Sequence, residues 1–296
     1  MLAARDAIGQ RTCRQGDLSK SMDIGDWIDS YPTDTLPQMR QVLDASAAST
    51  RWHALLDMSF VPSLRDRLPA PSSGRPIVTL YEGVYDGEGL MAISPCLMSL
   101  PDAAETRAAV CADLLRHTAG HPMLSLLRTT IDTDALASHL RRQMEASADD
   151  GEAFLVRLAD TRCLPTWVKV LTRPQRRRFL GGIDAWWMFD RAGSLMALDV
   201  ETVGMAGEDS VDTDSAPYRL AADQVATLRQ AAKIDTLLFH VRQRPDTFGQ
   251  LQATPSQAYA CVRDAWEAKN GAAQTPRVAL DALKAAGWLV PATISA

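Results

Sequence analysis

The chain has 296 residues, of which 46% are apolar, 23% charged and 6% aromatic, and its formal net charge is −5. This composition excludes a chain that is disordered throughout, and no apolar run reaches the roughly 18 residues of a membrane-spanning helix. The N-terminal sequence MLAARDAIGQRTCRQGD lacks the apolar segment of a secretory signal, so we expect a soluble cytoplasmic protein. The negative charge argues against a general affinity for nucleic acid.

Strands and helices alternate in the first two hundred residues, after an N-terminal tail. The tail lacks periodicity, and short helical stretches follow it up to residue 45. Short apolar or β-forming runs occur at residues 52–58, 77–85, 90–93, 97–100, 124–130, 154–158, 186–189 and 195–200, and helical patterns at residues 102–120, 133–144 and 173–180. Asp102 followed by Glu105 predicts a capping box, and the Asp190–Gly193 connection predicts a hairpin.

The last third of the chain differs in composition and periodicity: an acidic segment is followed by helical patterns. Residues 199–217 carry six acidic side chains and no basic one, which is typical of a solvated linker. They lack the glycine turn and terminal glutamate of a calcium loop. Helix signals follow at residues 220–241, at Thr254 with Gln257, and at Thr275 with Pro276.

We therefore predict an α+β fold with an α/β-like N-terminal lobe, built on a mixed sheet with flanking helices, and a small all-helical C-terminal lobe. The expected divisions are a tail with short helices (1–50), the α/β lobe (51–200), an acidic linker (201–217) and the helical lobe (218–296).

The search for catalytic motifs is negative. The sequence has no G-x-G-x-x-G, P-loop, G-x-S-x-G or H-E-x-x-H pattern. His117 and His121 have the spacing of two metal ligands on a helix, but Gly120 and Pro122 interrupt that helix. We therefore expect no metal and no cofactor. The cysteines have no C-x-x-C spacing and are expected to be reduced thiols: Cys13, Cys96, Cys111, Cys163 and Cys261.

Two groups of side chains are candidate partner contacts. Arg176 and Arg177 lie in a basic run that also contains Arg173 and Arg178, which either faces solvent, faces a protein or grips phosphates. Trp186 and Trp187 are adjacent in a predicted strand, so one ring is expected to face the core and the other the opposite surface. An exposed tryptophan would be an interface anchor, and the alternative is that the fold covers both rings.

A polar group surrounds the end of the strand at residues 154–158. Arg157, Asp160 and Arg162 favour a buried ion pair that fixes a loop, so we assign them to a structural polar cluster. The alternative is a small hydrolase or transferase with its polar site at these three residues. A deep pocket holding a histidine or cysteine beside them would favour that alternative.

Five motifs in order resemble the type VI secretion effector chaperones, also called adaptors. They read WHALLDM, LYEGVYDGEGLMAISPCLMSL, LLRTTIDTDALASHLRRQMEA, FLVRLADTRCLPTWVKVL and RPQRRRFLGGIDAWWMFDRAGSL. The residues that match the family pattern are Ala54 to Asp57; Leu80 to Gly83; Leu90, Ile93, Pro95, Leu97 and Leu100; Arg157, Asp160, Arg162 and Leu164; and Gly181, Gly182, Ile183 and Trp186. Met58 and Thr161 depart from it, at a usual small residue and a usual proline.

The resemblance implies a binding protein without catalytic activity or cofactor. Members of the family hold a cognate toxic effector in the bacterial cytoplasm and help to load it onto the VgrG tip of the secretion spike. The expected partners are therefore the effector and VgrG, with no nucleic acid and no membrane, and the unbound chain is expected to be a monomer.

Overall fold

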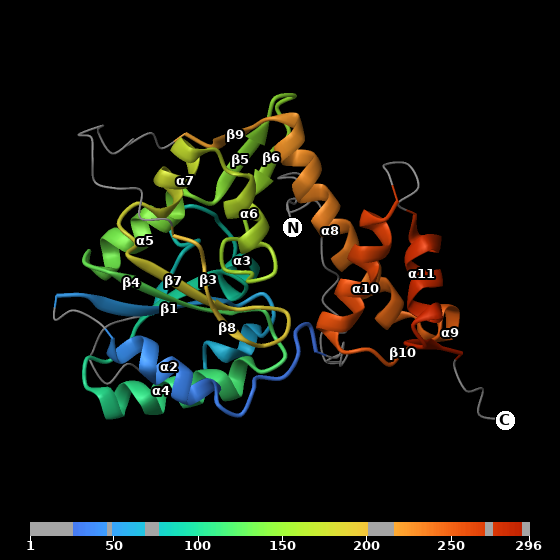
Figure 1. Ribbon diagram of the computed structural model, residues 1–296. Coiled ribbons are helices and arrows are strands. Elements are labelled where there is room, and N and C mark those ends of the chain that lie inside the picture. Colours follow the sequence, from blue (N-terminus) through green and yellow to red (C-terminus); the bar gives the residue numbers. More distant parts are fainter. Residues whose placement is uncertain (1–25, 46–48, 69–76, 201–215, 270–274, 292–296) are drawn as a thin grey trace.

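The structure is a computed structural model that describes residues 26–45, 49–68, 77–200, 216–269 and 275–291. Its centre is a six-stranded sheet with the order β2-β3-β1-β4-β7-β8, in which every neighbouring pair is antiparallel (Figure 1). The strands are β1 (Arg51–Asp57), β2 (Val78–Thr79), β3 (Pro95–Ser99), β4 (Leu124–Thr129), β7 (Ala185–Phe189) and β8 (Leu195–Ala197).

The central strands β1, β3 and β4 are apolar on both faces because helices cover both faces of the sheet. On one face, α2 (Thr35–Asp44) and α4 (Ala104–Thr118) bury the alternate positions of β1, including Trp52 and Leu56. On the other face lie α5 (Thr133–Arg142), α6 (Leu164–Val170) and α7 (Arg173–Leu180). Figure 1 shows α2 and α4 below the sheet and α5 to α7 above it. Apolar runs such as residues 54–56 are what a sheet between two helical layers requires.

A second, mixed sheet adjoins this core. In it, β5 (Glu145–Ala148) pairs antiparallel with β6 (Ala153–Leu155) and parallel with β9 (Tyr218–Leu220). The β9 strand lies about seventy residues after β5 in the sequence, so its pairing brings the start of the C-terminal part back to the N-terminal part. Tyr218 is buried there, with its ring edge-on to Trp167 of α6 at 5.3 Å.

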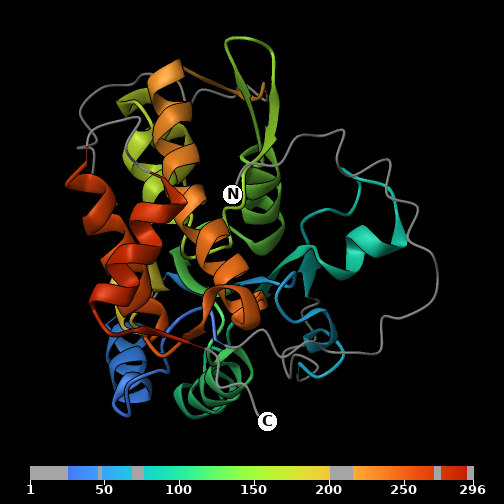
Figure 2. The same cartoon turned by 90° about the vertical axis from the view of Figure 1, so that its right-hand side faces the viewer.

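The C-terminal helices have a hydrophobic core of their own. The long helix α8 (Ala222–Gln243) packs against α10 (Pro255–Glu267), and α10 packs against α11 (Pro276–Ala285). Val262, Trp266 and Leu283 are buried between them. The connections contain the short helix α9 (Pro245–Phe248) and a two-stranded sheet of β10 (Gln250–Leu251) and β11 (Leu289–Val290). Figure 2 shows these helices from their outer side, standing beside the central sheet.

The α+β class is confirmed, and several elements begin where the sequence places them. Asp132 accepts the Ala135 N–H and caps α5, while Thr172 and Thr254 form capping boxes at α7 and α10. The β7–β8 hairpin also forms as expected. No helix among the described residues is long and apolar enough to cross a membrane.

Other details of the sequence prediction are wrong. The expected mixed pairing occurs in the β5–β6–β9 sheet, while the central sheet is antiparallel throughout; the C-terminal part contains β9, β10 and β11 rather than helices alone. Asp102 does not cap α4, whose N-cap is Ala103 without a side-chain hydrogen bond. The run 77–85 forms only a two-residue strand, because the N–H of Tyr81 bonds to Ser94 Oγ and a turn begins. Residues 1–25 and 201–215, which include the expected tail and most of the acidic linker, lie outside the described residues.

Candidate functional site

The structure brings the predicted polar cluster together at one end of the central sheet. Arg157 Nη2 lies 2.7 Å from Asp57 Oδ2, and Arg157 Nη1 lies 3.2 Å from Asp160 Oδ2. Arg162 Nη2 lies 2.9 Å from the same oxygen of Asp160. Asp57 ends β1, whereas the other three residues lie in the loop between β6 and α6. The cluster therefore ties this loop to the central strand of the sheet.

Asp160 is the centre of the cluster and has no exposed surface. Burial alone would raise its pKa, but the guanidinium groups of Arg162 and Arg157 hold the pKa well below the usual range of an aspartate. Its Oδ1 also accepts the backbone N–H of Arg162 at 3.1 Å. The carboxylate therefore stays charged at physiological pH and serves two cations.

The network continues to the C-terminal helices. Arg162 Nη1 lies 3.9 Å from Asp235 Oδ1 on α8, and Asp235 also binds Arg191 of the β7–β8 turn through two hydrogen bonds of 2.8 and 2.9 Å. The Arg162 guanidinium lies over the rings of Trp27 and Phe60, at 4.7 and 5.2 Å from their centroids. Charge pairs and aromatic rings thus join the sheet to α8.

The Cys163 thiol beside the cluster is not activated as a nucleophile. Burial, followed by the charge of Asp160, raises the pKa of the Cys163 thiol, so this sulfur stays protonated and unreactive at neutral pH. No group of three or more metal-ligating side chains occurs among the described residues. The two guanidinium groups of Arg157 and Arg162 are already engaged by carboxylates. These contacts tie the loop between β6 and α6 to β1 and to α8.

The two tryptophans of β7 point to opposite faces of the sheet, as strand alternation predicts. Trp186 has no exposed surface and stacks on Phe179 of α7 at 5.6 Å with an interplanar angle of 13°. Its position in the core corrects the expectation that Trp186 offers a ring to a partner. Trp187 is half-buried on the face that α2 covers, against Leu195 and the neighbouring core. Of the two rings, Trp187 alone keeps accessible surface.

The arginines of α7 have different environments. Arg177 is exposed and Arg176 half-buried, and neither forms an ion pair with a described residue. Arg178 instead lies over the ring of Tyr218, 4.3 Å from its centroid. The helix is held in place by Gln175, whose side chain donates to the carbonyl of Arg219 at 2.7 Å. Arg176 and Arg177 are therefore available to a partner, while Arg178 stabilises β9.

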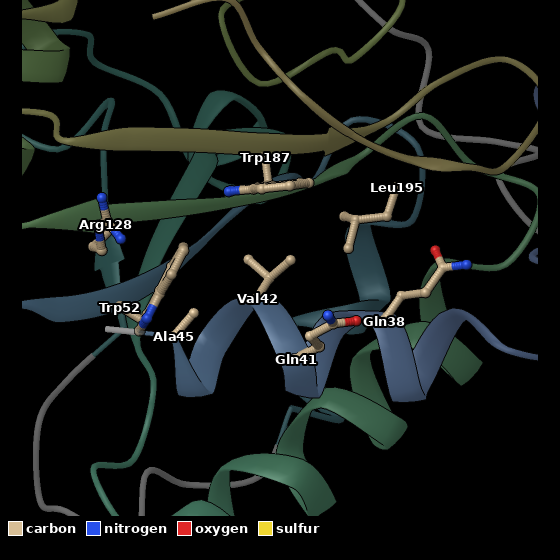
Figure 3. Close-up of a pocket in the computed structure, with 8 residues that line it drawn as sticks. All are labelled: Gln38, Gln41, Val42, Ala45, Trp52, Arg128, Trp187 and Leu195. Carbon is tan, nitrogen blue, oxygen red and sulfur yellow. The ribbon is translucent and has the colours of Figure 1, made fainter. Parts of the chain in front are cut away.

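A pocket of about 420 Å³ lies between α2 and the sheet, beside Trp187 (Figure 3). We call it the Trp187 pocket; its lining is Gln38, Gln41, Val42, Ala45, Trp52, Arg128, Trp187 and Leu195. Figure 3 shows Val42 pointing from α2 toward Trp187, with Arg128 and Trp52 together at one end and Leu195 at the other. Aromatic surface, amides and one guanidinium thus face a single opening.

Residues 52–178 match the model of a protein family described as a domain of unknown function, DUF4123. This segment of the chain is similar to the DUF4123 family. This family is that of the type VI secretion effector adaptors, and the match confirms the resemblance inferred from the ordered motifs. The matched segment covers less than half of the 296 residues, from the second residue of β1 to within α7. No curated protein and no solved structure matches the chain.

Of the residues that line the Trp187 pocket, the sequence predicted Trp187 alone as a candidate contact. Trp52 and Arg128 lie on β1 and β4 and are register partners, so they stand side by side on the same face as Trp187. A signal for Arg128 was present, because it is the one charged residue in the strand LSLLRT. A charge within a buried strand is costly unless it has a partner or a function.

Proposed function

We propose that this chain is an adaptor that holds a cognate type VI secretion effector in the bacterial cytoplasm and helps to load it onto the VgrG spike. The observation that carries the proposal is the DUF4123 match over residues 52–178. The matched residues contain both the polar cluster and two of the strands that line the Trp187 pocket, β1 and β4.

The chemistry of the described sites supports a binding role without catalysis. The guanidinium groups of Arg157 and Arg162 are balanced by the carboxylates of Asp57 and Asp160, and the neighbouring thiol is held protonated. Surfaces that bind protein partners transiently use tryptophan and arginine anchors within a polar rim. Trp187, Arg176 and Arg177 offer such groups, and the adaptor needs no cofactor for this role.

We further propose that the unbound adaptor is a monomer and that residues 51–200 and 218–296 act as two lobes separated by the acidic segment. An effector must later be released, so its interface has to be moderate in affinity rather than permanent.

The experiment is affinity purification of the tagged full-length chain from its native strain under secreting conditions. We expect the effector and VgrG encoded beside the chain to co-purify, and secretion of that effector to stop when the chain is deleted while other effectors are still exported. Recovery of neither partner, or unchanged export after deletion, would contradict the proposal.

A further inference from the structure

The Trp187 pocket has apolar walls from two different layers of the fold. Trp52 and Trp187 come from the sheet, while Val42 comes from α2. A volume of about 420 Å³ lies within the roughly 300–1,000 Å³ that binding sites for small ligands or anchoring side chains occupy. The pocket therefore has room for one or two apolar side chains between tryptophan faces.

Arg128 gives the pocket a positive charge that has no carboxylate partner among the described residues. Its Nε is buried and has no hydrogen-bond partner, and no carboxylate of a described residue forms an ion pair with it. The guanidinium lies over the Trp52 ring, 5.9 Å from its centroid. By contrast, Arg157, Arg162 and Arg191 are all paired with aspartates. A carboxylate that enters the pocket would give Arg128 the charged hydrogen bond that it lacks.

The shape of the pocket suits a short stretch of extended polypeptide. Arg128 is the register partner of Ala185, and Leu195 is the partner of Phe189, so the two ends of the pocket are four residues apart along β7. This separation corresponds to roughly 13 Å. Gln41 on the α2 side is exposed and carries an amide that can both donate to and accept from a peptide backbone. Because β8 is the last strand of the sheet, no described strand closes this side.

From these features, we propose that the Trp187 pocket is the docking site for an extended segment of the effector in which an apolar side chain neighbours a carboxylate. The apolar side chain packs between Trp187 and Val42, and the carboxylate pairs with Arg128. This inference rests on the proposed function, since it takes the partner to be the effector.

The first test measures the affinity of the full-length chain for the effector that co-purifies with it, using Arg128→Gln and Arg51→Gln as a matched pair. Arg51 is exposed at the start of β1, and its register partner Thr129 is the next residue after Arg128. We expect Arg128→Gln to weaken binding by about 10- to 100-fold, the effect of losing one charged hydrogen bond. Arg51→Gln should bind like the wild type, and both variants should keep the wild-type melting temperature.

The outcomes separate the two proposals. If the wild-type chain binds no effector, the proposed function and the docking site both fall. If the wild type binds and Arg128→Gln binds equally well, the docking site alone is wrong. If Arg128→Gln binds more weakly but also melts at a lower temperature, a charge swap decides whether the contact is direct. Arg128→Glu should lose binding, and binding must return when the contacting acidic residue of the effector is changed to arginine.

The second test identifies the occupant directly. The photo-crosslinker p-benzoylphenylalanine is placed at position 41 on the rim of the pocket, and for comparison at position 277, an exposed site on α11. We expect position 41 alone to crosslink to the effector, at a segment that contains an aspartate or glutamate, or the C-terminal carboxylate, next to an apolar residue. A crosslink to VgrG, or to residues 201–215 of the same chain, would overturn the assignment.

Discussion

Replacing Asp160 with asparagine tests whether the polar cluster is a structural brace. Asparagine keeps the shape of the side chain and can still accept the backbone N–H of Arg162, so the change removes the charge alone. Two guanidinium groups, at 2.9 and 3.2 Å, then lose their shared carboxylate, which itself has no exposed surface. Breaking a buried ion pair from one side costs about 3–5 kcal/mol. We expect Asp160→Asn to lower the free energy of unfolding by that amount.

The matched control is Asp113→Asn. Asp113 pairs with Arg116 at 2.9 Å, but both side chains are exposed, at 43% and 68%. An exposed pair contributes about 0–1 kcal/mol. Chemical denaturation of both variants at pH 7, followed by tryptophan fluorescence, gives the comparison. If Asp160→Asn costs no more than Asp113→Asn, the cluster does not brace the loop and our reasoning is refuted.

The stabilisation that Asp160 provides is expected to depend on pH. The pKa of Asp160 is lower in the folded chain than its unfolded value of about 3.9. Its contribution to stability is therefore complete above that value and is lost as the pH falls toward the folded pKa. We expect the difference in free energy of unfolding between the wild type and Asp160→Asn to be constant from pH 7 to about pH 5 and to shrink below pH 4.

Three further predictions concern other parts of the site. Trp186→Ala should lower the free energy of unfolding by about 3–5 kcal/mol, measured by chemical denaturation, because the ring is fully buried. Trp187→Ala should lower it less but weaken effector binding, and wild-type binding by this variant would exclude the ring as an anchor. Arg191→Gln removes the two hydrogen bonds to Asp235 on α8, and hydrogen bonds to charged groups contribute about 1.5–3 kcal/mol to stability. The substitution should therefore accelerate amide hydrogen exchange more in α8 than in β1. The double variant Arg176→Gln/Arg177→Gln should unfold like the wild type and recover less effector or VgrG, and unchanged recovery of both would remove α7 from the contact surface.

Local sequence signals were sufficient to predict the start of a helix where a capping residue and its partner lie three positions apart. Thr254 with Gln257 predicts a capping box, and it forms, because the hydrogen bonds involve residues only three apart. Thr172 with Gln175 forms the same kind of box at the start of α7. Asp102 has the same pattern but no cap, since α4 begins after Ala103. The β9 strand gave no local signal, because three residues are shorter than any periodic pattern and the strand is defined by its non-local partner β5.

The same distinction applies to the candidate site. The grouping of Arg157, Asp160 and Arg162 could be predicted because they lie within six residues of one another. Their partners Asp57 and Asp235 could not, since they are brought in from β1 and α8 by the packing of the whole chain. The Trp187 pocket depends on the register of three strands, which fixes whether Trp52, Arg128 and Trp187 share a face, and a shift of one residue would have separated them.

The polar cluster and the Trp187 pocket lie at opposite ends of the same strand, and this arrangement separates stability from binding. Trp52 lines the pocket and Asp57 joins the cluster, five residues apart along β1, which is roughly 17 Å. Sites more than about 7–10 Å apart that share no partner have additive effects. The double variant Asp160→Asn/Arg128→Gln should therefore lose the stability of the first change and the affinity of the second. If Asp160→Asn alone weakens effector binding at a temperature where the chain is folded, the two ends of β1 are coupled, and the cluster is part of the binding machinery rather than a brace.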